Sequence, residues 1–389
     1  MERVKILLGH VTSANNTNED SSEVLHKVFP NGCGLITLNR PKKLNALTTD
    51  MVRSIRKLLQ QWKNEGAIKF VAFSSMGERA FCAGGDIHAL ATQPGFAEVF
   101  FREEYHMNFE IATYPKPVVS LLKGIVMGGG VGISVHGTYR IVTEKTVFAM
   151  PETGIGLFPD VGGTHFLPNV CPGAVGMFLA LTGTRLKGGD IVAAGIGTHL
   201  VPVASLAQLQ HALTHQRQPA AACNLQDIIS LFSASSKSNA SESANPKPSA
   251  TLPLQTQRPL IDKCFSLHTV PAIVRALQNC AKGEEEAEQR WAEGVLATLN
   301  KKSPTSVQLT FEALRRNGKI PLPAALNIEY RLGVRIVNRG KAGDFYEGVR
   351  ATVIDKKSTP HWNLPPSTAE VEDYFAPFPK DFHVAELDL

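Results

Sequence analysis

Short apolar runs alternate with helical or glycine-rich segments through the first half of the chain, and this alternation limits the fold more than any other feature. Each run has the length and β-branched, apolar character of a buried strand. The expected strands are residues 34–39, 70–73, 118–122, 140–142 and 147–149. Between the first two, Thr48 offers a helix N-cap and Gly66 a stop, with apolar residues at helical spacing between them. Strands that alternate with helices predict an α/β architecture.

Local composition divides the chain into four parts. Residues 1–27 are expected to form a flexible tail, followed by a core over residues 28–232. Residues 233–259 are mainly Ser, Ala, Asn, Pro and Gln, so we expect a disordered insertion, because such a segment cannot bury enough apolar surface to offset its ordering entropy. Residues 260–389 contain Ala-, Leu- and Glu-rich stretches at helical spacing, which predict a helical region that completes the domain.

Overall composition excludes several classes of protein. The net charge of +5 comes from dispersed Lys and Arg, which gives little support for nucleic-acid binding and is compatible with an anionic ligand. No stretch of about 18 apolar residues is uninterrupted, so we expect no membrane-spanning segment. The 6 cysteines lack zinc spacing and are expected to be buried, reduced and free of metal.

Two glycine-rich segments follow expected strands. In Ala80–Ile87 (AFCAGGDI), adjacent glycines let the backbone turn sharply and present N–H groups. In Gly124–Gly132 (GIVMGGGVG), a strand leads into a helix, which places free N–H groups and the positive end of a helix dipole at one point. Two such sources of N–H groups can form an oxyanion hole. The alternative is that both are only tight turns packed against a sheet.

Glu152 and Asp160 stand in a mostly apolar loop bounded by Gly and Pro. Isolated carboxylates among apolar residues are desolvated, which raises the pKa toward the range that general acid–base catalysis uses. The alternative is structural, with Glu152 capping a helix and Asp160 holding a turn. His136, His165 and Cys82 lack a partner and are expected to be packed interior residues.

These segments together resemble the crotonase superfamily. The resemblance rests on AFCAGGDI, GIVMGGGVGIS and FAMPETGIGLFPDVGGTHFLP, and it continues through residues 39–47, 100–108, 179–190, 301–310 and 344–362. It implies a spiral of ββα units followed by a helical region that completes the crotonase-like domain. Within the superfamily the sequence most resembles the branch that hydrolyses 3-hydroxyisobutyryl-CoA in valine breakdown. The 3-hydroxypropionyl thioester is a second substrate that this resemblance implies.

The resemblance also implies roles for individual residues. The N–H groups of Gly85 and Gly129 would bind the thioester oxygen, with Ala83 and Gly84 along the coenzyme A. Glu152 and Asp160 would be the catalytic carboxylates, and Glu104 a further substrate contact. No metal and no redox cofactor is implied. Glu152 would either attack the carbonyl directly, giving a mixed anhydride, or take a proton from an attacking water; the sequence leaves both routes open.

Two other functions compete with thioester hydrolysis. Enoyl-CoA hydratases are similar to this sequence, but they carry a glutamate where this chain has Gly132 and a small residue where it has Asp160. A non-catalytic relative recruited into a mitochondrial ribosome is the other alternative, which retention of the two turns and two carboxylates disfavours. The resemblance implies mitochondrial residence, with the cytoplasm or peroxisome as alternatives, and it is compatible with a homo-oligomer.

Overall fold

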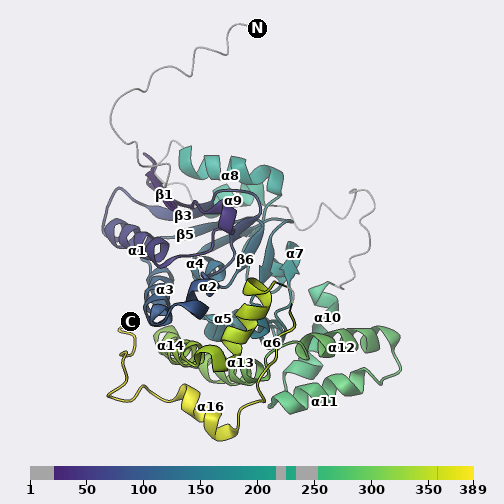
Figure 1. Cartoon of the computed structure of the whole chain (residues 1–389). Coiled ribbons are helices and arrows are strands. Elements are labelled where there is room, and N and C mark those ends of the chain that lie inside the picture. The colour runs from purple at the N-terminus through teal and green to yellow at the C-terminus, as the bar shows by residue number, and fades with distance from the viewer. Residues whose placement is uncertain (1–21, 216–224, 234–252, 357) are drawn as a thin grey trace.

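Two β-sheets form the centre of the structure (Figure 1). The computed structural model describes residues 22–215, 225–233, 253–356 and 358–389. The first sheet has the strand order β1-β2-β3-β5-β7-β10 and contains β1 (Val24–Val28), β2 (Cys33–Leu38), β3 (Phe70–Ser75), β5 (Val118–Leu122), β7 (Tyr139–Val142) and β10 (His199–Leu200). The second has the order β4-β6-β8-β9 and contains β4 (Ala80–Cys82), β6 (Ile125–Met127), β8 (Val147–Ala149) and β9 (Leu186–Lys187).

The chain passes back and forth between the two sheets. β3, β5 and β7 belong to the first sheet, and each is followed directly by a strand of the second, β4, β6 and β8. The pairings β2–β3, β3–β5 and β5–β7 are parallel, as are β4–β6 and β6–β8. Successive turns of the chain are therefore stacked in the same direction, which confirms the predicted spiral of ββα units.

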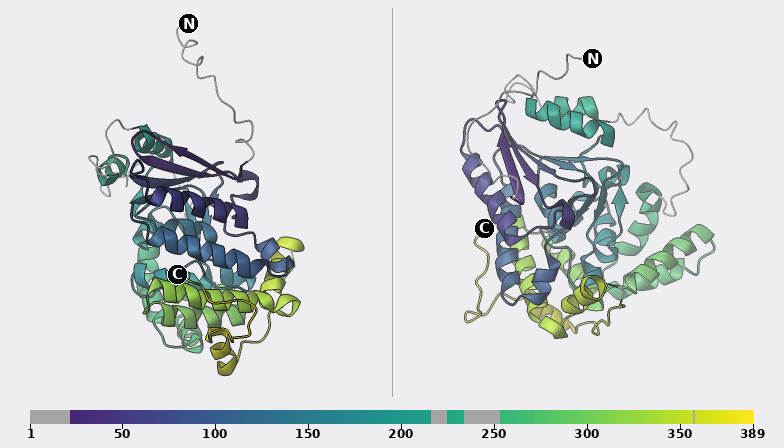
Figure 2. Two further views of the ribbon diagram at one scale, coloured as in Figure 1. Left: turned by 90° about the vertical axis from the view of Figure 1, so that its left-hand side faces the viewer. Right: turned by 45° about the horizontal axis from the view of Figure 1, so that its top comes forward.

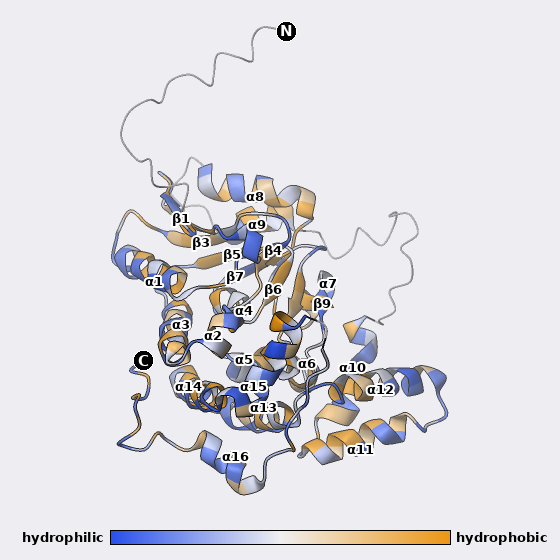
Figure 3. Ribbon diagram, in the orientation of Figure 1, coloured by the Kyte–Doolittle hydropathy of each residue, from blue (hydrophilic) through white to orange (hydrophobic). Residues whose placement is uncertain are grey.

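The strands β2, β3 and β5 of the first sheet are buried on both faces, which explains their continuous apolar runs. In β2 and β3, alternate residues point to opposite sides, so that Leu35 and Ala72 face one core and Ile36 and Phe73 the other. The outer face is covered by α8 (Val203–His215) and α9 (Leu225–Phe232), as Figure 2 shows from two further directions. In Figure 3 strands β3, β5 and β6 are mainly hydrophobic, while the helices carry hydrophilic stretches.

The remaining helices of the N-terminal half lie on the inner side of this sheet. They are α1 (Thr49–Lys63), α2 (Ile87–Thr92), α3 (Phe96–Ala112), α4 (Gly129–Val135), α5 (Gly163–Val170), α6 (Val175–Thr182) and α7 (Gly189–Ala193), with the 3₁₀ turns η2 (Pro41–Lys43) and η3 (Glu152–Ile155). The expected helix after Thr48 is α1, whose first turn is capped by the Thr48 hydroxyl, which accepts from the Met51 N–H. Its apolar face ends at the buried Trp62.

The C-terminal region is helical, as expected. It consists of α10 (Leu254–Phe265), α11 (Val270–Cys280), α12 (Glu286–Leu299), α13 (Pro304–Asn317), α14 (Leu322–Asn338), α15 (Asp344–Val349) and α16 (Thr368–Phe375), with the short turns η4 (Gly340–Ala342) and η5 (Arg350–Ile354). In Figure 1, α10, α11 and α12 extend to one side, whereas α13 and α14 lie beneath α3 and α5. Both parts share one hydrophobic core with the spiral, so they complete a single domain.

Two expected boundaries are wrong. The tail was expected to reach residue 27, but β1 begins at Val24 and pairs antiparallel with β2. β1 has no apolar run because it is an edge strand in which only Val24 is buried. The insertion was expected to reach residue 259, but α10 begins at Leu254, whose side chain is buried. Residues 1–21 and 234–252, on which the rest of these two predictions falls, lie outside the described residues.

Glycine allows α4 to approach β4 closely, and this contact can be tested. A Cβ at Gly130 would lie 2.8 Å from Cys82 Cβ and would collide with the Cys82 carbonyl. We expect Gly130→Ala to lower the free energy of unfolding by about 1–3 kcal/mol, because overpacking forces the backbone apart. The matched control is Gly189→Ala at the start of α7, where a Cβ meets nothing within 4 Å. Urea unfolding of both variants checks this, and equal stability of the two would contradict it.

Candidate active site

The two glycine-rich turns meet because the strands that precede them are neighbours. β4 ends at Cys82 and β6 at Met127, and the two strands pair in parallel, so their carboxyl ends lie at the same edge of the second sheet. A Cβ at Gly84 would lie 3.8 Å from the backbone nitrogen of Gly129. Gly84 has φ +114°, which favours glycine at this position. The turns predicted separately from the sequence are therefore in contact.

The two turns offer unbonded N–H groups. Within the described residues, the Gly85 N–H has no hydrogen-bond acceptor. Gly129 is the first residue of α4, where N–H groups lack an intrahelical partner. Helix α3 packs across both positions, because a Cβ at Gly85 would lie 2.9 Å from the Phe100 ring and one at Gly129 would collide with Glu104 Oε1. Side chains are thus excluded at both glycines, and a role of the two N–H groups as an oxyanion hole stays a prediction.

Carboxyl groups surround the second turn. Glu152 begins η3, directly after β8, and its Oε1 would lie 3.3 Å from a Cβ at Gly128. Glu104 comes from α3 and lies against Gly129. Asp160 follows eight residues after Glu152, and its Oδ2 accepts a 2.9 Å hydrogen bond from the Tyr105 hydroxyl. The three carboxyl groups are 2–6% exposed, so the fold places them in the interior.

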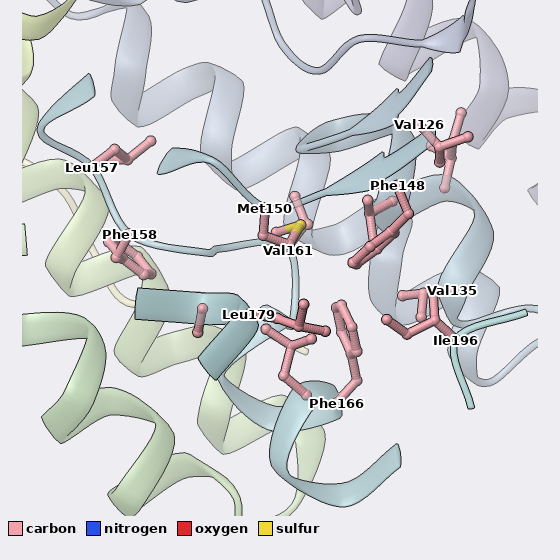
Figure 4. Close-up of a cluster of buried hydrophobic side chains, with 14 of the residues drawn as sticks. Val126, Val135, Phe148, Met150, Leu157, Phe158, Val161, Phe166, Leu179 and Ile196 are labelled. Atoms are coloured by element: carbon pink, nitrogen blue, oxygen red, sulfur yellow. The ribbon is translucent and has the colours of Figure 1, made fainter. Parts of the chain in front are cut away.

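Burial raises the pKa of all three carboxyl groups. It raises the pKa of Asp160 to about 6, which the Tyr105 hydroxyl opposes by hydrogen bonding. The pKa of Glu152 lies well above its ordinary value because of burial and the nearby Asp160. The pKa of Glu104 is also well above its ordinary value, from burial and then from Asp160 and Glu152. Met150, Leu157, Phe158 and Val161, from the same segment of the chain as Glu152 and Asp160, are among the buried apolar side chains in Figure 4.

Several polar atoms of the site have no partner in the described residues. They are Oε1 of Glu104, Oε2 of Glu152, and both side-chain polar atoms of Asn108. A buried polar atom without a hydrogen bond costs about 1–3 kcal/mol. Four such atoms beside two free N–H groups indicate a site that a polar ligand completes.

Asn108, Tyr105 and Lys302 were missed by the sequence analysis. Asn108 lies one helical turn after Glu104, and this i, i+4 spacing is the one signal in the sequence that could have found it. Tyr105 reaches Asp160 across 55 residues. Lys302 is half-buried, and its positive charge opposes the rise in the pKa of Glu152. No local pattern connects Lys302 with residue 152.

The other sequence predictions have mixed outcomes. Ala83 lies on the first turn, half-buried, and its contact with a ligand stays a prediction. Cys82 is buried as expected, whereas His136 and His165 are only partly buried. Cys33, Cys82, Cys171, Cys264 and Cys280 are free and buried, and Cys223 lies outside the described residues. Among the described residues no group of three or more His, Cys, Asp or Glu is arranged to hold a metal ion, and no described helix has the length and apolar character needed to cross a bilayer.

Gly132 has no room for a side chain. A Cβ there would lie 2.7 Å from Val161 Cβ and 2.8 Å from Asn108 Nδ2. A glutamate at this position would therefore require both the Asp160 loop and α3 to move.

The chain has close relatives of known name. A model of the enoyl-CoA hydratase/isomerase family matches residues 33–376. The 3-hydroxyisobutyryl-CoA hydrolase, mitochondrial, of Danio rerio is 43% identical over 96% of this chain and 92% of its own length. The protein of the same name from Homo sapiens is 41% identical over 93% of this chain and 89% of its own length.

Solved structures agree on the fold but carry other names. A carnitinyl-CoA dehydratase from Mycobacterium thermoresistibile has a TM-score of 0.77 and 35% identity, covering 92% of this chain and 97% of that one. An enoyl-CoA hydratase from Rhodobacter sphaeroides has a TM-score of 0.75 and 35% identity, with coverage of 92% and 98%. The names thus span hydrolysis, dehydration and hydration, so the side chains of the site have to distinguish among them.

The buried carboxyl of Asp160 predicts a specific pH dependence of stability. Its pKa in the folded protein, about 6, lies above the ordinary 3.8, so its ionisation destabilises the fold as the pH rises from about 4 to 6. Since one pKa unit corresponds to about 1.4 kcal/mol, Asp160→Asn should gain roughly 2 to 3 kcal/mol relative to wild type between pH 4 and pH 7.5.

Urea unfolding at both pH values measures this difference. The matched control is Asp50→Asn, because the Asp50 side chain is exposed on α1. An equal difference between wild type and Asp160→Asn at pH 4 and pH 7.5 would show that burial does not raise this pKa.

Proposed function

Because the chain belongs to the enoyl-CoA hydratase/isomerase family, we propose that it hydrolyses 3-hydroxyisobutyryl-CoA to 3-hydroxyisobutyrate and free coenzyme A. The single observation that carries this proposal is the pair of free N–H groups beside buried, partnerless carboxyl oxygens. The names of the relatives that are 41–43% identical support the same substrate. This activity belongs to valine breakdown, and the 3-hydroxypropionyl thioester is a second candidate substrate.

The Gly85 and Gly129 N–H groups act on the thioester oxygen. Attack on the carbonyl carbon moves negative charge onto that oxygen, and a preorganised donor of this kind contributes about 3 kcal/mol to lowering the barrier. Ala83 and Gly84, on the first turn, are proposed to lie along the coenzyme A. Glu104, whose Oε1 lies against Gly129, is proposed as a further contact to the acyl group.

Glu152 is the proposed catalytic carboxylate. On one route it attacks the carbonyl carbon, the C–S bond breaks, and water opens the resulting anhydride. On the other route it takes a proton from the attacking water, and the thiolate leaves as the C–S bond breaks. Either route needs Glu152 ionised, and the charge of Lys302 favours that form against burial.

Asp160 is proposed to bind the 3-hydroxyl of the substrate or to assist proton movement. Its Oδ2 accepts a hydrogen bond from the Tyr105 hydroxyl, which fixes the position of the carboxyl group.

Hydratase chemistry and a structural role fit the site less well. Hydration in this family uses a glutamate at the position of Gly132, where the packing against Val161 and Asn108 admits no side chain. A scaffold protein does not need buried carboxyl groups, which reduce stability. The mitochondrial names of the relatives support mitochondrial residence, and nothing in the comparisons supports the cytoplasm or peroxisome. Homo-oligomerisation stays a prediction.

Coenzyme A release from purified protein tests the proposal. We expect rapid release from 3-hydroxyisobutyryl-CoA and slow release from crotonyl-CoA and acetyl-CoA. Glu152→Gln should reduce kcat by at least about 100-fold, because the amide can neither attack nor accept the proton of water. Glu78→Gln, at an exposed glutamate paired with Lys123, is the matched control and should keep full activity. Wild-type kcat in Glu152→Gln, or no release from any thioester, would overturn the proposal.

The role of Asp160 is tested by comparing two substrates that differ only in the hydroxyl. If Asp160 binds that group, Asp160→Asn should lower kcat/KM for 3-hydroxyisobutyryl-CoA at least tenfold. The fall for isobutyryl-CoA should be much smaller, because only the first substrate loses a charge-assisted hydrogen bond. kcat/KM measured with both thioesters gives the ratio. Unchanged activity on both substrates would remove Asp160 from the mechanism.

A further inference from the structure

The backbone just after Asp160 adopts a strained conformation. Val161 has φ +53° and Gly162 φ +83°. A β-branched residue in this left-handed region is a rare outlier and costs free energy, so the surrounding structure has to hold it there. Val161 is fully buried, and its side chain lies among those of Met150 and Phe166 in Figure 4. The strain is therefore located one residue from a proposed catalytic carboxylate.

Glu329 holds this strained turn from one side. It projects from α14 and is fully buried. Its Oε2 accepts the Gly162 N–H at 2.7 Å, and its Oε1 accepts the Thr164 N–H at 3.0 Å together with the Thr164 hydroxyl. The amide of Asn317 donates to the Thr164 Oγ1 at 2.8 Å, which directs the hydroxyl proton toward Glu329. Three donors thus converge on one carboxyl group at the N-terminus of α5.

Glu329 has no cationic partner among the described residues. Within the described part of the chain it forms no ion pair with Lys, Arg or His. Burial raises its pKa to about 8, the three donors oppose the rise, and the charge of Asp160 adds to it. A buried carboxyl without a salt bridge lowers the stability of the fold through desolvation. Ser, Thr, Asp or Asn at the N-cap position would cap the helix without that loss. Its position therefore calls for an explanation beyond stability.

His136 holds the turn from the other side. Its Nε2 lies 2.8 Å from the Val161 carbonyl oxygen, so the imidazole carries its proton on Nε2 and donates it. Burial lowers the pKa of His136 to about 4, which keeps the ring neutral. His136 follows the last residue of α4, the helix that begins at Gly129. One short helix therefore carries a proposed oxyanion-hole donor at its start and a contact to the Asp160 turn at its end.

We infer that Glu329 and His136 are positioning residues that fix the strained Val161–Gly162 turn and thereby aim the Asp160 carboxyl at the acyl group. This inference rests on the role proposed for Asp160. A catalytic group has to be placed within fractions of an ångström, so a fixed turn next to Asp160 matters for catalysis. The hydrogen bonds of Glu329 and His136 go to residues 161–164, and not to the turn at residues 83–85 that is proposed to bind coenzyme A. We call Glu329 and His136, with their hydrogen bonds to the strained turn, the clamp. Weakening the clamp should lower kcat and leave the binding of coenzyme A unchanged.

Glu329→Gln is the variant that tests the clamp. The amide has one acceptor oxygen, and its NH₂ would face an N–H donor, so at least one hydrogen bond is lost. We expect kcat for 3-hydroxyisobutyryl-CoA to fall at least tenfold and KM to change less than about twofold. The matched control is Glu98→Gln, because Glu98 is also buried but bonds to Asn338 and His383; it should keep wild-type kcat.

Two further readouts separate positioning from a general loss of structure. Amide hydrogen exchange over residues 159–166 should accelerate at least tenfold in Glu329→Gln and stay unchanged in Glu98→Gln, because the Gly162 and Thr164 N–H groups lose their acceptor. In the Asp160→Asn background, Glu329→Gln should cause no further loss of kcat, because both act through Asp160. The inference would be overturned if Glu329→Gln kept the wild-type exchange rate or the wild-type kcat. It would also be overturned if the fold-losses in kcat from Glu329→Gln and Asp160→Asn multiplied in the double variant.

Milder variants keep the test decisive if Glu329→Gln does not fold. Thr164→Val removes one of the three donors and should lower kcat about threefold. His136→Leu removes the contact to the Val161 carbonyl and should lower kcat, whereas His136→Gln keeps an N–H donor and should restore part of it. Equal activity of the two His136 variants would contradict the inference.

The inference and the proposed function fail in distinguishable ways. If Asp160→Asn slows turnover but the Glu329 and His136 variants do not, the hydrolase proposal stands and the clamp is wrong. If Asp160→Asn keeps full turnover, the role proposed for Asp160 is wrong, and the claim that the clamp serves catalysis falls with it.

Discussion

The parallel pairing of β4 with β6 is the constraint on which the rest of the site depends. It brings the ends of two strands, which lie 45 residues apart in the chain, to one sheet edge, so that the turns containing Gly85 and Gly129 lie side by side. Helix α3 can then pack across both turns with Phe100 and Glu104, because neither glycine carries a side chain. The close approach of the two turns is therefore a consequence of sheet register rather than of either turn alone.

Burial of three carboxyl groups around those turns reduces stability. Glu104, Glu152 and Asp160 each have a raised pKa, and two of them keep an oxygen without a partner. The fold compensates elsewhere with a large core that spans the spiral and the C-terminal helices. Destabilising groups concentrated at one place in an otherwise well-packed interior are typical of a functional site.

The C-terminal helices do more than cover the spiral. Helix α14 places Glu329 at the N-terminus of α5, and the segment before α13 places Lys302 near Glu152. Both contacts connect residues separated by 150 positions or more, so neither can be predicted from local composition or periodicity. The same holds for Tyr105 and Asp160, whose partnership arises only when α3 packs against the loop.

The sequence alone determined the features that depend on neighbouring residues. Apolar runs located β2, β3, β5, β7 and β8, and the Thr48 cap located α1. The glycine-rich motifs located the two turns, the carboxylates in an apolar loop identified Glu152 and Asp160 as candidates, and the resemblance to the crotonase superfamily singled out Gly85 and Gly129. Local pattern failed at the edge strand β1 and at the start of α10, where few side chains are buried. Only the tertiary structure brought the carboxyl groups together, closed the space beside Gly132, and joined Glu329 and His136 to the turn after Asp160. The physical reason is that desolvation, close packing and hydrogen bonds between distant segments exist only once the chain has folded.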